Sequence, residues 1–160
     1  ADAILLPEIP FDIEHVANSI RERDRQGKRF SIVAVAEGAA PVGGFTDDKE
    51  FADAGEEHHV GTRVGRRLEA LTGVEARVTI LGYVQRGGSP TPADRLLATK
   101  LGTAAADLLA DGEYNVLVAS RGDGWKAIPL EEVSGKRRTV PLDHAWLRAA
   151  RLIGTSFGDE

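Results

Sequence analysis

The sequence predicts an α/β fold built on a mostly parallel sheet, and three observations lead to that prediction. Short apolar runs of the strand type alternate with stretches of helical periodicity, which is typical of βαβ units. One of these runs, 30–36, is apolar almost throughout, as central parallel strands are. The connections also carry helix-start signals, of which the strongest is at Thr91-Pro92. A chain of 160 residues is long enough to bury a core without disulfides or metals.

Each element follows from its own local pattern. Asp12 is a predicted N-cap, with Phe11 and Val16 placed for a hydrophobic staple, and Gly27 is expected to end that helix. Residues 39–56 mix Pro, Gly, Asp and Glu without periodicity and are predicted to form an exposed loop. In chain order we expect a strand at 3–6, a helix at 12–27, a strand at 30–36, a helix at 60–71, a strand at 76–83, a helix from 91 to about 112, a strand at 116–119, a short strand at 125–128 paired across a turn at 122–124, and a closing amphipathic helix at 142–153.

The composition excludes several classes of function. With 20 basic and 25 acidic residues the net charge is −5, which gives no general attraction to nucleic acid or to an anionic membrane. The absence of cysteine excludes disulfides, thiol catalysis and Cys-ligated metal centres. No apolar run is long enough to span a membrane. The chain begins with Ala1 and contains no methionine, so we expect the later part of a longer protein, folded as a single domain over 1–160.

The segment around Arg86 is the strongest candidate site. In open parallel sheets, ligands bind beyond the carboxyl ends of the strands, and this segment follows a predicted strand. Gly87 and Gly88 would let backbone N–H groups approach an anion, the following helix start adds a partial positive charge, and Arg86 offers a fork of donors that suits phosphate. The alternative is a simple turn with a solvated arginine. The established nucleotide-phosphate motifs are missing, so a nucleoside triphosphate site is not predicted.

Two other candidates lie at the ends of predicted strands. Glu37, which ends the second strand, could accept hydrogen bonds from sugar hydroxyls, or could pair with an arginine or a helix N-terminus. Arg77 precedes Arg86 by nine positions, which in an extended strand places the backbones about 25–30 Å apart. Arg77 is therefore expected to serve the opposite edge of its own subunit, to reach a neighbouring subunit's site, or to form a surface salt bridge.

The opposite edge of the sheet carries charges of its own. Lys28 and Arg29 precede the second strand and Asp2 precedes the first. A second anion or a metal-chelated phosphate could bind there, although such a cluster is more often solvated. Trp125 and Trp146 are interpreted as packing residues.

The run Arg77-Val-Thr-Ile-Leu-Gly-Tyr83-Val-Gln-Arg86-Gly-Gly-Ser-Pro, continuing to Asp94-Arg95, resembles the 6-phosphofructokinase family. The resemblance extends to Pro7-Glu8-Ile9-Pro10-Phe11-Asp12 and to 31–38, with fitting separations. It leaves out only the loop around 41–56 and the tail after about 140. It implies one lobe of a Rossmann-like three-layer αβα fold, namely the C-terminal, fructose 6-phosphate-binding half of a cytoplasmic enzyme.

The resemblance also implies roles for single residues. Glu37 matches a glutamate that contacts fructose hydroxyls, and Tyr83 and Arg86 match residues that hold the 6-phosphate. Arg77 matches an arginine that reaches the 6-phosphate of an adjacent subunit, so a dimer or tetramer is implied. Asp2, Lys28 and Arg29 fall near the effector site of allosteric members.

Departures from the family pattern limit what the chain itself can do. Tyr83 stands where many ATP-using members have histidine, and the 41–56 loop resembles several subgroups, including pyrophosphate users. The half with the donor loop, the catalytic aspartate and the Mg²⁺ ligands is absent, so this chain holds no catalytic or metal residue, and alone it should be inactive. The expected reaction is phosphorylation of fructose 6-phosphate in glycolysis, with ATP or pyrophosphate and Mg²⁺ in the complete enzyme. The alternative is a stand-alone module that binds a sugar phosphate or an effector.

Overall fold

The computed structural model describes residues 1–43 and 59–160. Its contacts gather into two compact units, Ala1–Ile80 with Thr139–Glu160, and Leu81–Arg138, and each is described by itself. The sequence predicts one domain over 1–160, and this stays a prediction. The elements are β1 (Ala3–Leu5), α1 (Ile13–Arg25), β2 (Val33–Val35), α3 (Val60–Thr72), the 3₁₀ helix η1 (Gly82–Arg86), α4 (Pro92–Ala110), β3 (Val116–Arg121), β4 (Gly124–Pro129), α5 (Leu130–Val133) and α6 (Ala145–Leu152).

The first unit is built on a parallel pair of strands, as predicted. β1 pairs with β2 in parallel, with Ala3 opposite Val33 and Leu5 opposite Val35. On the other side of β1, residue 156 forms a parallel bridge with Ala3, and the Ile4 N–H donates to the Ser156 carbonyl at 2.9 Å. The end of the chain therefore extends the sheet beyond its two named strands.

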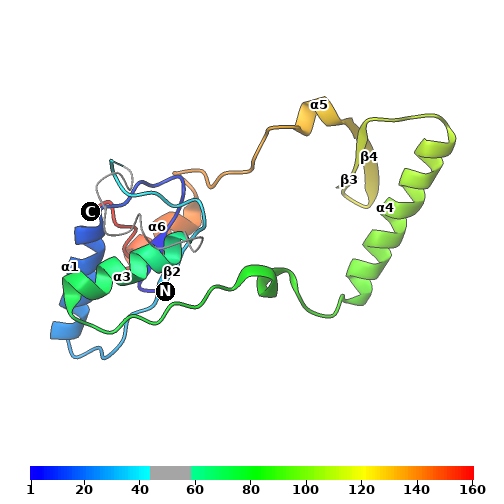
Figure 1. Cartoon of the computed structure of the whole chain (residues 1–160). Helices are drawn as coiled ribbons and strands as arrows, with labels where there is room; N and C mark the ends of the chain where they lie inside the picture. Colours follow the sequence, from blue (N-terminus) through cyan, green and yellow to red (C-terminus); the bar gives the residue numbers. More distant parts are fainter. Residues whose placement is uncertain (44–58) are drawn as a thin grey trace. The chain divides into compact units, whose positions relative to one another are not determined.

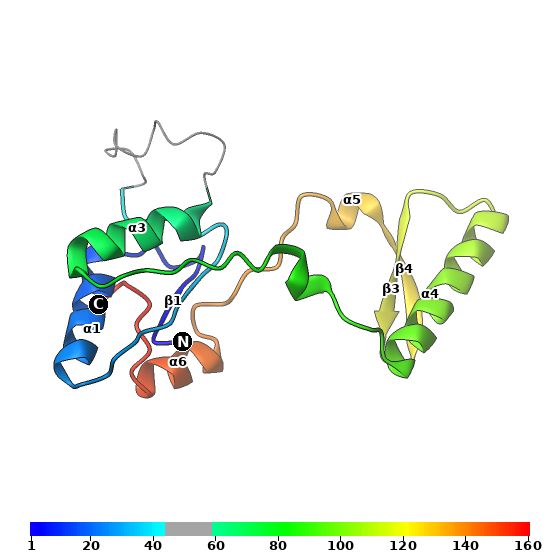
Figure 2. The ribbon, with the colours of Figure 1, turned by 60° about the horizontal axis from the view of Figure 1, so that its bottom comes forward.

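The alternation of side chains along β1 produces three layers. Ala3 and Leu5 are buried in a cluster with residues of α1 and α3, whereas Ile4 and Leu6 pack against a second cluster that includes Leu147 of α6. Successive residues of a strand point to opposite faces, so helices cover both faces of the sheet. Figure 1 shows α1 and α3 side by side, and Figure 2 shows β1 lying between α3 and α6. The predicted three-layer α/β class is confirmed.

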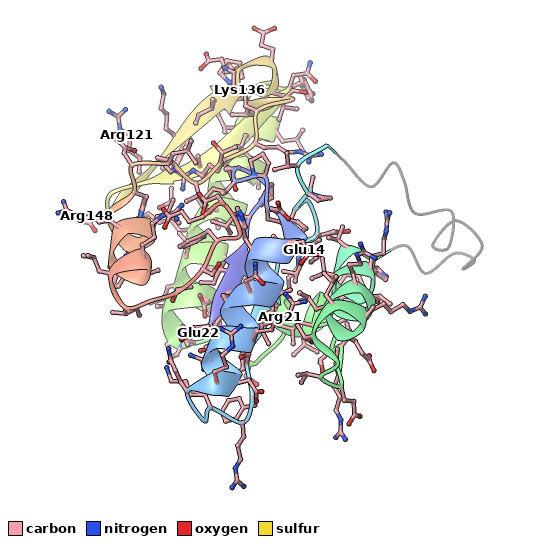
Figure 3. The ribbon with its side chains drawn as sticks, turned by 90° about the vertical axis from the view of Figure 1, so that its left-hand side faces the viewer. Glu14, Arg21, Glu22, Arg121, Lys136 and Arg148 are labelled. Atoms are coloured by element: carbon pink, nitrogen blue, oxygen red, sulfur yellow. The ribbon has the colours of Figure 1, made fainter. Side chains whose placement is uncertain are left out.

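The helix signals of the first unit are also confirmed. The Asp12 side chain accepts a hydrogen bond from the Glu14 N–H at 2.8 Å, and Phe11 and Val16 are buried in one cluster. α1 ends at Arg25, and Gly27 follows it with φ of +78°. Its outer face carries charged side chains (Figure 3), among them Arg21, whose Nη1 lies 3.8 Å from Glu14 Oε2.

The second unit consists of a long helix and a hairpin. β3 and β4 pair in antiparallel register with Ser120 opposite Trp125, and the turn lies at Gly122–Asp123, as predicted. α4 packs against β3, and the short helix α5, which the sequence did not predict, follows β4. α4 begins with the predicted capping box: Thr91 accepts from the Asp94 N–H, while the Asp94 carboxylate accepts from the Thr91 N–H.

The predicted strand over 76–83 is wrong. Residues 73–81 form neither a helix nor a strand, and the structure shows η1 where the strand was expected to end. A strand needs a neighbour to satisfy its N–H and C=O groups, and no strand of the described residues pairs with 76–83. Gly82, with φ of +47°, then turns the backbone out of the extended conformation.

The predicted exposed loop over 39–56 lies mostly outside the described residues. Its first residue is an exception to the prediction, because Ala39 is only 2% exposed and belongs to the core of the first unit. Its N–H donates to the Ala36 carbonyl, and the next few residues return to Phe11 through a bridge with Pro41. Tertiary contacts therefore bury a small residue that the local sequence assigns to a surface loop.

Candidate functional site

Tyr83 and Arg86 lie on the same face of η1 in the second unit. A 3₁₀ helix has three residues per turn, so side chains three positions apart are aligned along one side. Tyr83 is 88% exposed, and Arg86 is exposed as well. In the described part of the chain neither side chain has a hydrogen-bond or ion-pair partner. A phenol hydroxyl and a guanidinium, both donors, are thus presented together to the solvent.

The backbone of the same segment adds few donors. The N–H groups of Val84 and Gly87 donate to the carbonyls of Leu81 and Val84, at 2.9 and 3.2 Å. Gly88 has φ of +114°, a conformation that favours glycine, and its N–H has no partner among the described residues. The predicted glycine turn therefore offers one free backbone donor, at Gly88, next to the arginine.

At the start of α4, an acidic side chain opposes the attraction for anions that the sequence suggested. Pro92 has no N–H, and the Asp94 N–H donates to Thr91 Oγ1 at 3.3 Å. The Asp94 carboxylate accepts hydrogen bonds from the side-chain hydroxyl and the backbone N–H of Thr91. These hydrogen bonds, the side-chain one most of all, lower the pKa of Asp94 below the ordinary value of 3.8. A carboxylate that is ionised at neutral pH thus occupies the helix start, so recognition of a phosphate would depend on Arg86, Tyr83 and Gly88.

Glu37 lies in the first unit, two residues after the end of β2. It occupies a turn that is closed by a 3.0 Å hydrogen bond from the Ala39 N–H to the Ala36 carbonyl, and its side chain is exposed. Gly38 allows this turn to lie close to Pro7, since an added Cβ would come within 3.3 Å of the proline ring. In the described residues the Glu37 carboxylate has no hydrogen-bond or ion-pair partner. It therefore pairs with neither an arginine nor a helix N-terminus of this part of the chain, the two alternatives that the sequence left open.

Arg77, also in the first unit, forms the surface salt bridge that the sequence left open as one interpretation. Its Nε lies 3.1 Å from Glu75 Oε1, and its side chain is 85% exposed. Exposed ion pairs of this kind contribute little to stability, so the guanidinium can exchange this partner for another at small cost. Its reach into a neighbouring subunit stays a prediction.

At the predicted second edge, the structure gives Asp2 a structural position. Asp2 Oδ1 lies 2.8 Å from Arg23 Nη2, and Asp2 Oδ2 accepts from the Ile32 N–H at 2.7 Å. Both carboxylate oxygens are thus used within the protein, at the junction of α1 with the two strands. Lys28 and Arg29 are exposed, and their role in binding an effector stays a prediction.

Sequence reasoning missed Arg151, which holds the last residues of the described chain. Its guanidinium makes hydrogen bonds of 2.9 and 2.6 Å to Asp159 and of 3.0 Å to Glu160, and it lies 4.7 Å from the centre of the Phe157 ring. The Arg151 hydrogen bonds lower the pKa of Asp159 below 3.8. No sequence pattern predicts this pair, because it depends on the chain folding back onto β1.

A cavity of about 500 Å³ lies beside α6, the helix from which Arg148 extends in Figure 3. Arg148 and Arg151 line it together with Asp143 and Glu160, so charges of both signs face it. Within the described ranges, no three metal-ligating side chains form a group that could hold a metal ion. None of the helices in residues 1–43 and 59–160 has the length and apolar character needed to cross a membrane.

The layers of the first unit define an α/β protein, and comparison with known proteins identifies its family. The family model described as Phosphofructokinase matches residues 1–109. The chain is 48% identical to the ATP-dependent 6-phosphofructokinase of Propionibacterium freudenreichii over 99% of its own length and 48% of the relative's. It is also 48% identical to the enzyme of the same name from Spirochaeta thermophila, of which it covers 44%. The chain belongs to the phosphofructokinase family, and it spans about half the length of these relatives.

Solved structures agree with this assignment. The Pichia pastoris phosphofructokinase in the T-state aligns with 82% of this chain and 14% of its own, with a TM-score of 0.54 and 29% identity. A pyrophosphate-dependent phosphofructokinase from Nitrosospira multiformis aligns with 88% of this chain and 34% of its own, with a TM-score of 0.60. At 20% identity, the second likeness supports the fold alone.

Proposed function

We propose that this chain is the C-terminal, sugar-phosphate-binding half of a 6-phosphofructokinase. The complete enzyme would transfer a phosphoryl group from ATP or pyrophosphate to the 1-hydroxyl of fructose 6-phosphate and yield fructose 1,6-bisphosphate, a step of glycolysis. The family membership and the curated relatives' names support the reaction. The share of the relatives that the chain covers supports its being one part of such an enzyme.

The alignment of Tyr83 and Arg86 on one face of η1 is the observation that carries the proposal. A guanidinium can donate two parallel hydrogen bonds to a phosphate, and the charge on both partners makes these bonds stronger than neutral ones. The phenol hydroxyl of Tyr83 adds a neutral donor. Neither side chain is used inside the described part of the protein, so both can bind the 6-phosphate.

Glu37 and Arg77 have the remaining proposed roles. The free Glu37 carboxylate would accept hydrogen bonds from fructose hydroxyls, a contact that needs an acceptor without an internal partner. Arg77 would leave Glu75 and bind the 6-phosphate held by a neighbouring subunit, which requires a dimer or tetramer. Lys28 and Arg29 remain candidates for an effector site.

Phosphoryl transfer needs a donor, a metal and a base at the same time. The described residues contain no group of side chains that suits Mg²⁺. On the basis of the resemblance to the family, we assign the donor, its Mg²⁺ and the catalytic aspartate to the other half of the enzyme and expect the 160-residue chain alone to be inactive. We place the enzyme in the cytoplasm, with neither nucleic acid nor membrane as partner.

The proposal is tested by Arg86→Ala in the complete enzyme that contains this chain. We expect KM for fructose 6-phosphate to rise by well over tenfold, as follows from the loss of a charge-assisted contact. Arg67→Ala, which removes an exposed arginine of α3, is the matched control and should leave KM unchanged. Arg86→Lys, which keeps the charge but loses the fork of donors, should fall between the two. An unchanged KM in Arg86→Ala would remove the proposed role.

A further inference from the structure

The turn that follows β1 carries part of the motif that resembles the phosphofructokinases, yet the proposed function gives this turn no role. Residues 6–9 form it, and a 3.3 Å hydrogen bond from the Ile9 N–H to the Leu6 carbonyl closes it; we call it the Glu8 turn. Glu37 lies in the corresponding turn after β2, at 36–39. Parallel strands end at the same edge of a sheet, so both turns lie at the edge where ligands bind in folds of this class.

The two turns are in direct contact. A Cβ added to Gly38 would lie 3.3 Å from Cγ of Pro7, so the proline ring packs against the backbone next to Glu37. Where the turns begin, the Ala36 N–H donates to the Leu5 carbonyl at 3.0 Å. The backbone that presents Glu37 therefore rests on the Glu8 turn, and a shift of one turn would displace the other.

The side chain of Glu8 connects this turn to a distant part of the chain. Its Oε1 accepts a hydrogen bond of 2.9 Å from the N–H of Val140, which is 132 positions away in the sequence. Val140 lies next to Thr139, where the chain returns to the first unit. The side chain of Val140 packs against the second buried cluster, formed by Ile9, Leu147 and Phe157. Glu8 thus fixes its turn to a segment that is itself held by the core.

The other oxygen of the Glu8 carboxyl group makes this contact a costly one. Oε2 is buried and has no hydrogen-bond partner among the described residues. A polar atom that is buried without a partner is unfavourable, so this oxygen offsets part of the stability that the bond to Val140 supplies. Stability alone therefore does not explain why a glutamate stands here, and a role in positioning the neighbouring turn does.

We infer that Glu8 is a positioning residue for the sugar-binding glutamate. Its bond to Val140 holds the Glu8 turn in place, Pro7 of that turn supports the backbone at Gly38, and Glu37 is thereby aimed at its ligand. The inference rests on the proposed function in one respect, namely that Glu37 accepts hydrogen bonds from sugar hydroxyls. Glu8 itself need not touch the sugar.

Amide hydrogen exchange followed by nuclear magnetic resonance in the 160-residue chain tests the structural part. In Glu8→Ala, the Val140 amide loses its acceptor and the Ala39 amide, which closes the Glu37 turn, loses its support. Both should exchange at least about tenfold faster than in the unaltered chain. Glu8→Gln keeps a carbonyl oxygen that can accept from Val140, so it should restore slow exchange at both amides. Protection of the Val16 amide of α1 shows in each variant that the first unit is folded.

Steady-state kinetics of the complete enzyme test the functional part. Glu8→Ala should raise KM for fructose 6-phosphate about tenfold and leave KM for the phosphoryl donor and kcat within about twofold, because only the sugar contact is misplaced. Glu8→Gln should return KM for the sugar phosphate to within about twofold of the unaltered value. Glu69→Ala, which removes an exposed glutamate of α3, is the matched control and should change neither KM. A general loss of folded enzyme would instead lower kcat and leave both KM values unchanged.

Two results would overturn the inference. Unchanged exchange of the Ala39 amide in Glu8→Ala would show that the Glu37 turn does not depend on Glu8. A Glu8→Gln variant as impaired as Glu8→Ala would assign the effect to Oε2 rather than to the bond with Val140. Faster exchange at Ala39 together with an unchanged KM for fructose 6-phosphate would support the link between the turns and contradict the sugar contact of Glu37, which belongs to the proposed function.

Discussion

Replacing Gly158 with alanine should destabilise the first unit more than the same replacement at any other glycine of that unit. Gly158 has φ of +77°, and a Cβ built on it would lie 2.7 Å from Phe11 Cβ and 2.9 Å from Val16 Cγ2. Phe11 and Val16 are among the largest fully buried side chains. Because Phe11 Cβ is attached directly to the backbone, it cannot move aside cheaply.

Two costs add to the expected magnitude. The left-handed conformation costs an alanine about 1–2 kcal/mol. Forcing an extra methyl group into a packed core costs about 1–3 kcal/mol more. Together they predict a loss of about 2–5 kcal/mol, a large fraction of the stability of an ordinary domain. Gly154 provides the matched control, because its φ is +85° and an added Cβ would meet no atom within 4 Å. Gly154→Ala should therefore lower the stability only by the cost of the left-handed conformation.

Native-state hydrogen exchange at the Val16 and Ala17 amides of α1 measures the free energy of opening of this unit alone. The two variants should differ by about 1–3 kcal/mol, which is about 5- to 150-fold in exchange rate. Equal losses in Gly158→Ala and Gly154→Ala would refute the reasoning, because the clash with Phe11 and Val16 would then contribute nothing. A loss in Gly154→Ala alone would contradict it more strongly.

Three further predictions concern polar contacts. Thr91→Ala removes the capping box and should destabilise α4 by about 1 kcal/mol. The measurement is hydrogen exchange of the first-turn amides of α4 in the complete enzyme, which should become faster. Unchanged exchange would show that the cap does not stabilise the helix. The pKa of Asp159 is lowered by hydrogen bonds from Arg151, so its stabilisation should be present above pH 3.8 and lost as the pH falls through the lower folded-state pKa. Asp159→Asn should remove this part of the acid dependence in a urea titration at several pH values, and an unaltered dependence would contradict the assignment. Asp2→Asn should weaken the contact with Arg23 and lower the urea midpoint of the first unit, while an unchanged midpoint with altered effector binding would favour the effector role instead.

Local chemistry made several parts of this protein predictable. The starts of α1 and α4 are encoded by Asp12 and by Thr91 with Asp94, because capping needs only residues within one helical turn. The end of α3 is encoded by Gly73, which adopts the left-handed conformation. The hairpin turn at 122–124 has the same local origin. The phosphofructokinase motif around Arg86 is likewise contiguous in sequence, and the family comparison confirms the family that the motif indicates.

Other features depend on residues far apart in sequence. The predicted strand over 76–83 failed because a strand exists only with a partner, and apolar periodicity does not say whether one is near. Trp146, interpreted as a packing residue, is 78% exposed, whereas Ala39 in a polar stretch is buried. Asp2, expected among effector-binding residues, contacts Arg23 and Ile32, a pairing that requires α1 to return beside β1.

The sequence by itself determined the existence of the longer helices α1, α3, α4 and α6, the starts of α1 and α4, and which family the chain resembles, since these depend on neighbouring residues. Only the tertiary structure decided which of its apolar residues are buried and which charged groups remain free for a ligand. Burial is a property of surfaces brought together by the whole fold. The same residue types therefore give a core around Phe11 and Val16 and an open apolar surface around Leu109.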